Sequence, residues 1–493
     1  MLLEDIIRFN LPHIFSFFEF DNFQAHSFKI TKDAEFDIDN DINTNFAEKI
    51  AKAVKNRRKG KPTRFVFDKE MDNTLVEFLI KKLNFSKKDS IIPGQKIHNF
   101  KDFMDFPNIF RKYKKPIERS SLSHPELIEK ARISDIIAKK DILLSFPYHN
   151  FDHVIDILRE AAIDPDVQSI QITAYRLASN SKIANALLNA VRNGKEVTVM
   201  LELRARFDEE HNLLWKERFE TEGIQVLIGV PHKKVHAKLC IIKKRRKNNK
   251  TIQYGFVSTG NLNEKTSKLY GDYCLLTSNR TIMADINKVF AMLKKSKIDF
   301  DTHIKPSKGL LLCPTIMREC IIEYIDTEIK EALAGRPAHI IIKVNSVSDK
   351  LLINKLYEAA EAGVKIEMIV RGIFCIVNQK NFKKPIYAIS IVDEYLEHAR
   401  VFYFYNKGEE HIYISSADWM TRNLEHRLEA AVRIQDKKLK VELLHMLQIQ
   451  LRDNVKARLL DDSVNNKYLV NGTEKTRSRL AIFHYLHPKY ISQ

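Results

Sequence analysis

Between residues 233 and 273 the chain reads KKVHAK (233–238), STGN (258–261) and YGDY (270–273). His236 and Lys238 are two residues apart, so on a β-strand their side chains point to the same face. The small-residue turn that ends in Asn261 can supply further hydrogen-bond donors to the same anion. A reduced copy follows, with HAR at 398–400 and SSAD at 415–418. Two copies in comparable settings indicate a repeated unit with one histidine in each copy.

The sequence around these motifs is also duplicated. ITAYRLASNSKIANALLNAVRNGKEVTVML (172–201) and IKVNSVSDKLLINKLYEAAEAGVKIEMIV (342–370) both predict a strand, a helix closed by glycine and a second strand. The glycines, Gly194 and Gly363, are 169 residues apart, and the histidine motif follows each one. This order predicts a duplicated α/β unit and a composite site where the two copies meet.

Length and composition predict about three domains, at roughly 150 residues each. We place them at 1–132 (a partial middle domain, helical or α+β), 133–303 and 304–493 (two α/β units). Residues 1–20 predict an amphipathic helix that begins abruptly, from which we expect an upstream domain to be missing. The net charge of +18, with 81 basic and 63 acidic residues, favours a polyanionic partner such as nucleic acid, anionic lipid or polyphosphate. The sequence contains no run of 18 apolar residues, so it predicts no membrane-spanning helix.

Paired histidines suit phosphoryl transfer. Imidazole is a good nucleophile toward phosphorus, and a second histidine can act as acid or base. Each ring needs a carboxylate to fix its tautomer. We expect Asp272 to orient His236 and Glu429 to orient His398. A phosphoanhydride also needs a cationic pocket, for which the candidates are Lys238, Arg400, Arg176, Arg206, Arg371 and Arg427.

Other motifs have simpler interpretations. A lone histidine is usually a hydrogen-bonded structural residue, and this is what we expect of His124, His149, His153 and His487. The basic runs at 56–61 and 243–250 are predicted to be solvated loops, the second one in a hairpin. The aromatic run 401–405 predicts the core of a strand rather than a surface that stacks bases. The five cysteines have no metal-ligand spacing.

The two His-x-Lys/Arg motifs resemble those of the phospholipase D superfamily. The longer wording resembles bacterial polyphosphate kinases of the large, histidine-phosphorylated type. The matching segments include PYHNFDHVIDILREAAIDPDVQSIQITAYR, KVHAKL, STGNLNEKTSKLYGDY, VKIEMIVRGIFC, YLEHARVFYF and YISSADWMTRNLEHRLE, and they cover most of residues 140–435. LLEDIIRFNLPHIF resembles the family's middle domain. The resemblance implies two tandem phospholipase D-like α/β domains.

The resemblance also implies roles for single residues. His236 matches the phosphorylated histidine and His398 the second essential histidine. Tyr270, Arg371 and His398 match nucleotide-contacting positions. Arg400 and Arg427, which are candidates for the cationic pocket, are expected to bind the nucleotide with them. Arg176 and Arg206 match the magnesium-phosphate site, where guanidinium, which has no lone pair, would bind phosphate oxygens rather than Mg²⁺. ATP, ADP and polyphosphate are the implied substrates.

The resemblance implies a cytoplasmic homo-oligomer without a specific nucleic-acid ligand, and peripheral membrane association stays open. The chain departs from the phospholipase D motif at Lys243, where that motif has Asp, so phosphodiester hydrolysis is a minor alternative. The family's N-terminal domain, which carries an asparagine at the adenine end of the ATP site, is not found in this sequence. A second alternative is therefore a catalytically weak module that binds polyphosphate or another polyanion.

Overall fold

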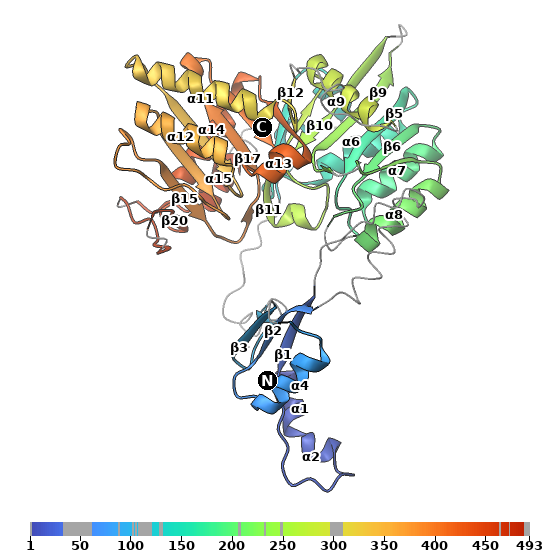
Figure 1. Ribbon diagram of the computed structural model, residues 1–493. Coiled ribbons are helices and arrows are strands. Elements are labelled where there is room, and N and C mark those ends of the chain that lie inside the picture. The colour runs from blue at the N-terminus through green and yellow to red at the C-terminus, as the bar shows by residue number, and fades with distance from the viewer. Residues whose placement is uncertain are drawn as a thin grey trace. The chain divides into compact units, whose positions relative to one another are not determined.

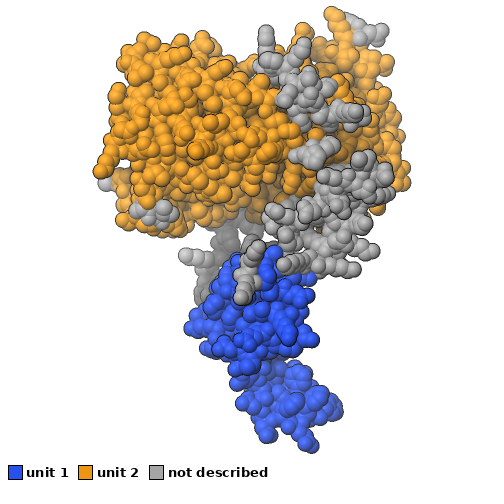
Figure 2. All heavy atoms as spheres, in the orientation of Figure 1, with its two compact units in different colours: residues 1–119 blue, residues 120–493 orange. Residues whose placement is uncertain are grey.

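The computed structural model describes residues 2–32, 62–86, 89–100, 103, 106, 121–127, 132–205, 209–230, 233–246, 250–295, 309–462, 465–472 and 474–487. The chain forms two compact units, residues 1–119 and residues 120–493 (Figure 2). The predicted helix and basic loop between residues 44 and 61 lie outside the described residues.

The first unit contains a small three-stranded sheet and short helices. Its elements are α1 (Leu3–Phe9), α2 (Leu11–Ile14), β1 (Phe28–Lys32), β2 (Pro62–Asp68), α4 (Asn73–Lys82) and β3 (Ser90–Gly94). The strands form one sheet in the order β1-β2-β3, and Phe65, Met71 and Val76 form its core. The helix expected over residues 1–20 is two short helices, and no residue of α1 is buried.

The second unit begins with the first copy of the repeat. Its elements are η3 (Pro125–Leu127), α5 (Ile133–Ile137), β4 (Ile142–Phe146), α6 (Asp152–Ile163), β5 (Val167–Ala174), α7 (Lys182–Arg192), β6 (Glu196–Leu201), α8 (Glu209–Thr221), β7 (Gln225–Ile228), β8 (Lys234–Val235), β9 (Lys238–Arg245), β10 (Thr251–Ser258), η4 (Thr266–Lys268), β11 (Tyr270–Thr277) and α9 (Arg280–Leu293). Strand, helix and strand alternate through β4–β7, as the sequence predicted.

The second copy follows the same plan (Figure 1). Its elements are β12 (Leu310–Cys313), α11 (Met317–Leu333), β13 (His339–Val344), α12 (Lys350–Ala362), β14 (Lys365–Val370), β15 (Tyr387–Ile391), β16 (Leu396–Glu397), β17 (Arg400–Phe404), η5 (Asn406–Gly408), β18 (His411–Ser415), α13 (Thr421–His426), β19 (Arg427–Arg433), α14 (Lys437–Leu451), β20 (Ala457–Leu459) and α15 (Ser478–Leu486).

Sheet topology confirms the duplication. The first sheet has the order β11-β10-β9-β5-β6-β7 with β4 on β11, and the second has β12-β19-β18-β17-β13-β14-β15. Seven strands of each copy therefore occupy matching places, and the second sheet carries one more strand, β20, which pairs with β15. The helices that the repeat shares also end alike, because Gly194 (φ 76°) and Gly363 (φ 94°) both adopt the left-handed conformation that glycine tolerates best.

The two copies are joined by strand pairing as well as by packing. The two-residue strand β8 of the first copy pairs in parallel with β19 of the second, and β16 of the second pairs in parallel with β11 of the first. One apolar core runs through both sheets and includes helices α9 and α14, with Phe290, Val401 and Leu447 among its members. The aromatic run 401–405 lies largely in β17, and Val401–Phe404 are buried, as predicted.

Residues 133–303 and 304–493 thus belong to one compact unit, in which the α/β duplication is confirmed. The exact boundaries at 132/133 and 303/304 stay predictions.

Candidate active site

His236 follows the short strand β8 and lies at the junction of the two copies. The carbonyl of Leu428, on β19, accepts hydrogen bonds from the backbone N–H groups of both His236 and Ala237, each at 2.9 Å. The next residue on β19 is Glu429, whose Oε2 lies 2.8 Å from Nδ1 of His236. Glu429 is fully buried. Backbone pairing between the copies therefore sets the ring against its carboxylate.

His398 is held in the same manner by the opposite copy. The carbonyl of Gly271, on β11, accepts from the N–H groups of His398 at 3.1 Å and Ala399 at 2.7 Å. The next residue, Asp272, places both carboxylate oxygens 2.9 Å from Nδ1 of His398. The two half-sites are built by one rule, in which a carbonyl holds the histidine backbone and the following carboxylate holds the ring.

The predicted pairing of histidines with carboxylates was wrong. The sequence led us to expect Asp272 beside His236 and Glu429 beside His398, within each copy. The structure crosses them, so that each histidine is oriented by the other copy's carboxylate. The reason is that β8 and β16 pair with strands of the opposite copy. This pairing brings the end of each short strand beside a carboxylate of that copy, Glu429 for β8 and Asp272 for β16.

The repeated small-residue turns hold these carboxylates. Thr259 donates its hydroxyl to Asp272 Oδ1 at 2.6 Å, and Ser416, at the same place in the second turn, donates to Glu429 Oε2 at 2.5 Å. Asn423 donates to the other oxygen of Glu429 at 2.8 Å. A Cβ atom added to Gly260 would lie 2.2 Å from Asp272 Oδ2. This turn therefore needs glycine so that the carboxylate can come close.

Both histidines are neutral at physiological pH in this setting. The pKa of His236 is lowered to about 3, chiefly by burial and also by the positive charges of Lys238 and Arg427, against the opposing effect of Glu429. Burial also lowers the pKa of His398. Since an ionised carboxylate only accepts hydrogen bonds, Nδ1 of each ring carries the proton. Nε2 of His236 then has a free lone pair, which is what a nucleophile requires.

Cationic side chains surround the two rings. Arg400 donates to the His398 carbonyl at 2.8 Å and pairs with Asp418 at 3.0 Å. Arg427 lies 3.8 Å from Glu429. Arg371 donates to Asn345 at 2.5 Å, and its pKa is lowered by burial and by the charge of Arg400. These cations belong to the second copy and converge on the site.

Lys238, in the first copy, occupies the place that Arg400 has in the second copy. Within the part of the chain that the structure describes, its Nζ is buried and has no hydrogen-bond partner. The corresponding cation of the second copy, Arg400, is paired with Asp418. Burial lowers the pKa of Lys238 to about 7. A buried ammonium without a partner is costly, so this position fits a phosphate oxygen as its counter-ion.

One tyrosine lies beside each histidine. Tyr175 contacts His236 edge-on with ring centroids 5.0 Å apart, and Tyr270 lies 5.3 Å from His398. Lys238 lies 5.5 Å from the Tyr175 ring, and Arg176 lies 5.7 Å from it. The structure thus gathers the predicted site residues at one junction, except Arg206, which lies outside the described residues.

Three contributors were not identified from the sequence, namely Tyr175, Asn423 and Asn345. Ser416 and Asp418 were recognised as part of the SSAD turn, the copy of STGN, but the sequence did not assign them to Glu429 and Arg400. The side chain of Asn345 accepts a hydrogen bond from Arg371 and donates one to the His398 carbonyl at 3.2 Å. Its only sequence signal is its position directly after the repeated strand.

The simpler interpretations mostly hold. His153 accepts from the His124 N–H, and His149 accepts from the Ser145 N–H, both at 2.9 Å, as expected of structural histidines. In the basic run 243–250, residues 243–245 belong to β9 and buried Lys244 pairs with Asp164 at 2.7 Å, whereas residues 247–249 lie outside the described residues. The prediction of a solvated loop was therefore wrong for the first three residues.

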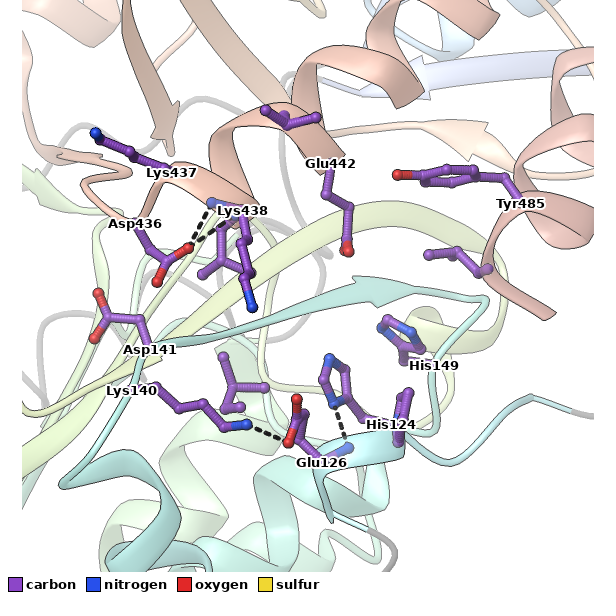
Figure 3. Close-up of a pocket in the computed structure, with 15 residues that line it drawn as sticks. His124, Glu126, Lys140, Asp141, His149, Asp436, Lys437, Lys438, Glu442 and Tyr485 are labelled. Carbon is purple, nitrogen blue, oxygen red and sulfur yellow. Dashed lines mark hydrogen bonds and ion pairs between the residues drawn. The ribbon is translucent and has the colours of Figure 1, made fainter. Parts of the chain in front are cut away.

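A large cavity lies away from the two histidines. Its volume is ≈ 1120 Å³, and it is lined by residues of η3, β4, α14 and α15. Figure 3 shows His124 and His149 on one side of it and Glu442 and Tyr485 on the other. None of the residues that line it belongs to the site described above.

The described residues contain no group of three His, Cys, Asp or Glu side chains placed to hold a metal ion. Over the same ranges, no helix is long and apolar enough to cross a membrane.

Comparison with known proteins identifies the family. Residues 1–106, 132–299 and 310–479 match the polyphosphate kinase middle domain, C-terminal domain 1 and C-terminal domain 2, respectively. Polyphosphate kinase from Escherichia coli K12 is 41% identical over 496 residues, which cover 99% of this chain and 70% of that protein. The Vibrio cholerae polyphosphate kinase is 40% identical over 491 residues, with 99% and 69% coverage.

A solved structure agrees with this result. The crystal structure of polyphosphate kinase from Porphyromonas gingivalis matches with a TM-score of 0.86 and 34% identity, and the match covers 100% of this chain and 71% of that one. Three family domains, relatives at 40–41% identity and a similar solved fold agree with one another. The chain belongs to the polyphosphate kinase family.

Proposed function

We propose that this chain transfers the terminal phosphate of ATP reversibly to polyphosphate, through a phosphohistidine at His236. One observation carries the proposal. The carboxylate of Glu429 holds Nδ1 of His236, which leaves Nε2 free as a nucleophile beside the ammonium of Lys238, to which the described residues offer no hydrogen-bond partner. ATP and ADP are substrates in this proposal, and polyphosphate is the acceptor and, in reverse, the donor.

In the first step Nε2 of His236 attacks the γ-phosphorus of ATP. The N–P bond forms as the bond from phosphorus to the bridging oxygen breaks, and the electron pair leaves with ADP. Lys238, Arg400 and the arginines near them stabilise the charge on the transferring group. The proton on Nδ1 stays in its hydrogen bond to Glu429, which stabilises the positive charge that develops on the ring.

In the second step a terminal oxygen of polyphosphate attacks the phosphohistidine. The N–P bond breaks and its electron pair returns to Nε2, so His236 is regenerated and the polymer is one phosphate longer. In this proposal His398, which Asp272 orients and whose Nε2 lies 3.4 Å from Arg400, exchanges a proton with the leaving or attacking group or, when protonated on Nε2, binds a phosphate oxygen.

Magnesium enters this scheme with the nucleotide. Because the described residues offer no cluster of carboxylates or histidines as ligands, Mg²⁺ would be carried by phosphate oxygens as MgATP. Arg176 and Arg206 would bind those oxygens. The proposal also includes a cytoplasmic homo-oligomer, as the family resemblance implies.

Labelling with [γ-³²P]ATP tests the proposal. The protein is expected to acquire label that is stable in alkali and labile in acid, and His236→Ala is expected to lose it completely. His339→Ala is the matched control, because His339 also pairs with a carboxylate, Glu367 at 2.7 Å, but lies outside the site. Label that persists in His236→Ala would rule out the assignment.

Two other functions make different predictions. A catalytically weak polyanion-binding module would bind polyphosphate with an affinity that falls steeply with salt, but would form no ATP from polyphosphate and ADP. A phosphodiesterase would hydrolyse a chromogenic phosphodiester. A luminescence assay of ATP formation separates both from the proposed kinase.

A further inference from the structure

Behind His398 lies a buried polar cluster that the reaction scheme does not use. Lys343, on β13, places Nζ 2.5 Å from Glu397 Oε2 and donates to Gln450 Oε1 at 2.9 Å. Gln450, on α14, donates in turn to the same Glu397 oxygen at 2.9 Å. The side chains of Lys343 and Glu397 are 3% and 11% exposed. We call these three residues the Glu397 clamp.

Stability alone is a weak reason for such a cluster. Charges removed from water lose their hydration, and replacing a buried ion pair by apolar residues of similar volume is often neutral or stabilising. What directional bonds add is position, because they fix the atoms they join far more narrowly than apolar contacts do. The bonds to Lys343 and Gln450 therefore fix the position of Glu397 and of the backbone beside it.

Glu397 directly precedes His398 and belongs to β16, which consists of two residues. In β16 it pairs with Gly271, whose carbonyl then accepts from the His398 N–H. Leu396, the other residue of β16, is 37% exposed, so apolar burial contributes little to holding the strand. Successive side chains on a strand point to opposite faces, so Glu397 reaches the clamp while His398 reaches Asp272.

In the first copy of the repeat, the side chain of the residue before the histidine is held by apolar burial instead of by polar contacts. The residue before His236 is Val235, which is 2% exposed and belongs to the apolar core. Lys343 lies opposite Val401, three residues after His398. The residue that occupies this place in the first copy is Thr173, which accepts a hydrogen bond from the Leu239 N–H at 2.9 Å. Val235 and Thr173, at the corresponding places of the first copy, thus form no such clamp among the described residues.

The clamp also borders the carboxylate that orients His398. A cavity of ≈ 10 Å³, about the space one water molecule needs, is lined by Asp272 together with Lys343, Glu397 and Gln450. A shift of Glu397 would therefore disturb both the backbone of His398 and the surroundings of its acid.

We propose that Glu397 is the positioning residue of His398 and that Lys343 and Gln450 lock it through directional hydrogen bonds. This inference rests on the proposed function, because it takes the rate of that reaction to depend on the exact position of His398. Glu397 acts through His398 and touches no substrate. Loss of the clamp leaves His398 present but misplaced.

The decisive variant replaces the clamp by apolar residues, as Lys343→Met/Glu397→Leu/Gln450→Leu. It keeps approximately the same volume, so we expect a folded protein that melts within a few degrees of the wild type. Its kcat is expected to fall at least tenfold and up to about 10²-fold, the scale on which a catalytic group displaced by about 1 Å loses rate. KM for ATP is expected to change less than threefold. A folded variant with wild-type kcat would overturn the proposal.

Two single variants separate geometry from charge. Glu397→Gln keeps an oxygen that can accept from both Lys343 and Gln450, so kcat is expected within about threefold of the wild type although the protein is less stable. Lys244→Met, which breaks the buried pair with Asp164 in the first copy, is the control. It is expected to lower stability and to leave kcat of the folded enzyme unchanged. Equal losses of kcat in Lys244→Met and the clamp variant would refute a positioning role.

A structural readout keeps the inference separate from the proposed function. In a crystal structure of the clamp variant, His398 is expected to have moved from Asp272, which it contacts at 2.9 Å in the wild type. An unchanged contact would contradict the positioning role even if the wild-type chain made no polyphosphate. Conversely, an inactive wild type with a displaced His398 in the variant would refute only the proposed function.

Discussion

The crossed pairing of histidines and carboxylates makes its sharpest prediction for Glu429→Gln. Glu429 accepts three hydrogen bonds with two oxygens: Oε2 receives His236 and Ser416, and Oε1 receives Asn423. A glutamine has one oxygen and one NH₂ group. If its NH₂ group faces His236, Nδ1 must become the acceptor and the ring proton moves to Nε2. His236 then has no lone pair directed at phosphorus.

The other orientation keeps the tautomer but loses the charge. With the oxygen toward His236, the glutamine NH₂ group meets Asn423, whose amide can turn to present Oδ1, a buried oxygen without a hydrogen-bond partner among the described residues. The neutral glutamine then no longer stabilises the positive charge that develops on the imidazole ring. A histidine in the wrong tautomer costs a comparable hydrolytic triad roughly 10⁴-fold in rate. We therefore expect phosphorylation of His236 to slow by roughly 10³–10⁴-fold, which corresponds to about 4–5.5 kcal/mol.

Rapid-quench labelling with [γ-³²P]ATP measures this step in a single turnover. Asp272→Asn is the matched control, because it makes the same chemical change beside His398. It is expected to slow labelling at least tenfold less than Glu429→Gln does. The reverse order would refute the crossed assignment, as would Glu429→Gln labelling within tenfold of the wild type. Histidine ¹⁵N chemical shifts provide a second readout, since they report the tautomer of His236 without turnover.

Three further predictions follow from the same geometry. The pKa of Lys238 is lowered to about 7, and phosphate binds the protonated amine, so KM for ATP is expected to rise above pH 7 by up to about tenfold per pH unit. The arginine of Lys238→Arg is always charged, so this variant should flatten the dependence of KM on pH between pH 6 and 9. Gly260→Ala is expected to reduce activity at least tenfold in steady-state assays, because the new Cβ would displace Asp272. The Cβ of Gly363→Ala meets only Lys383, at an ordinary contact distance of 3.7 Å, and strains the left-handed backbone, so unfolding in denaturant should show a loss of about 1–2 kcal/mol with unchanged kcat.

The sequence predicted much of the fold because the relevant signals are local. The alternation of apolar strands and helices, together with the glycines at 194 and 363, depends on contacts within a few residues. The repeat by itself then indicates the two α/β copies. His236, His398 and their flanking cations are found in the same way from the repeated motif, although each histidine lies just before the strand that its cation begins and not on that strand, as the spacing had predicted.

What could not be read from the sequence depends on which strand ends meet. Asp272 and His398 are 126 residues apart, and Glu429 and His236 are 193 apart. The partner of each ring is set by the parallel pairing of β8 with β19 and of β16 with β11, and a two-residue strand carries no periodic signal of its own. The Glu397 clamp has the same origin, since its three side chains come from β13, β16 and α14. Residue types and local spacing thus specify the chemistry available to this chain, whereas the register between its two copies assigns each carboxylate to its histidine.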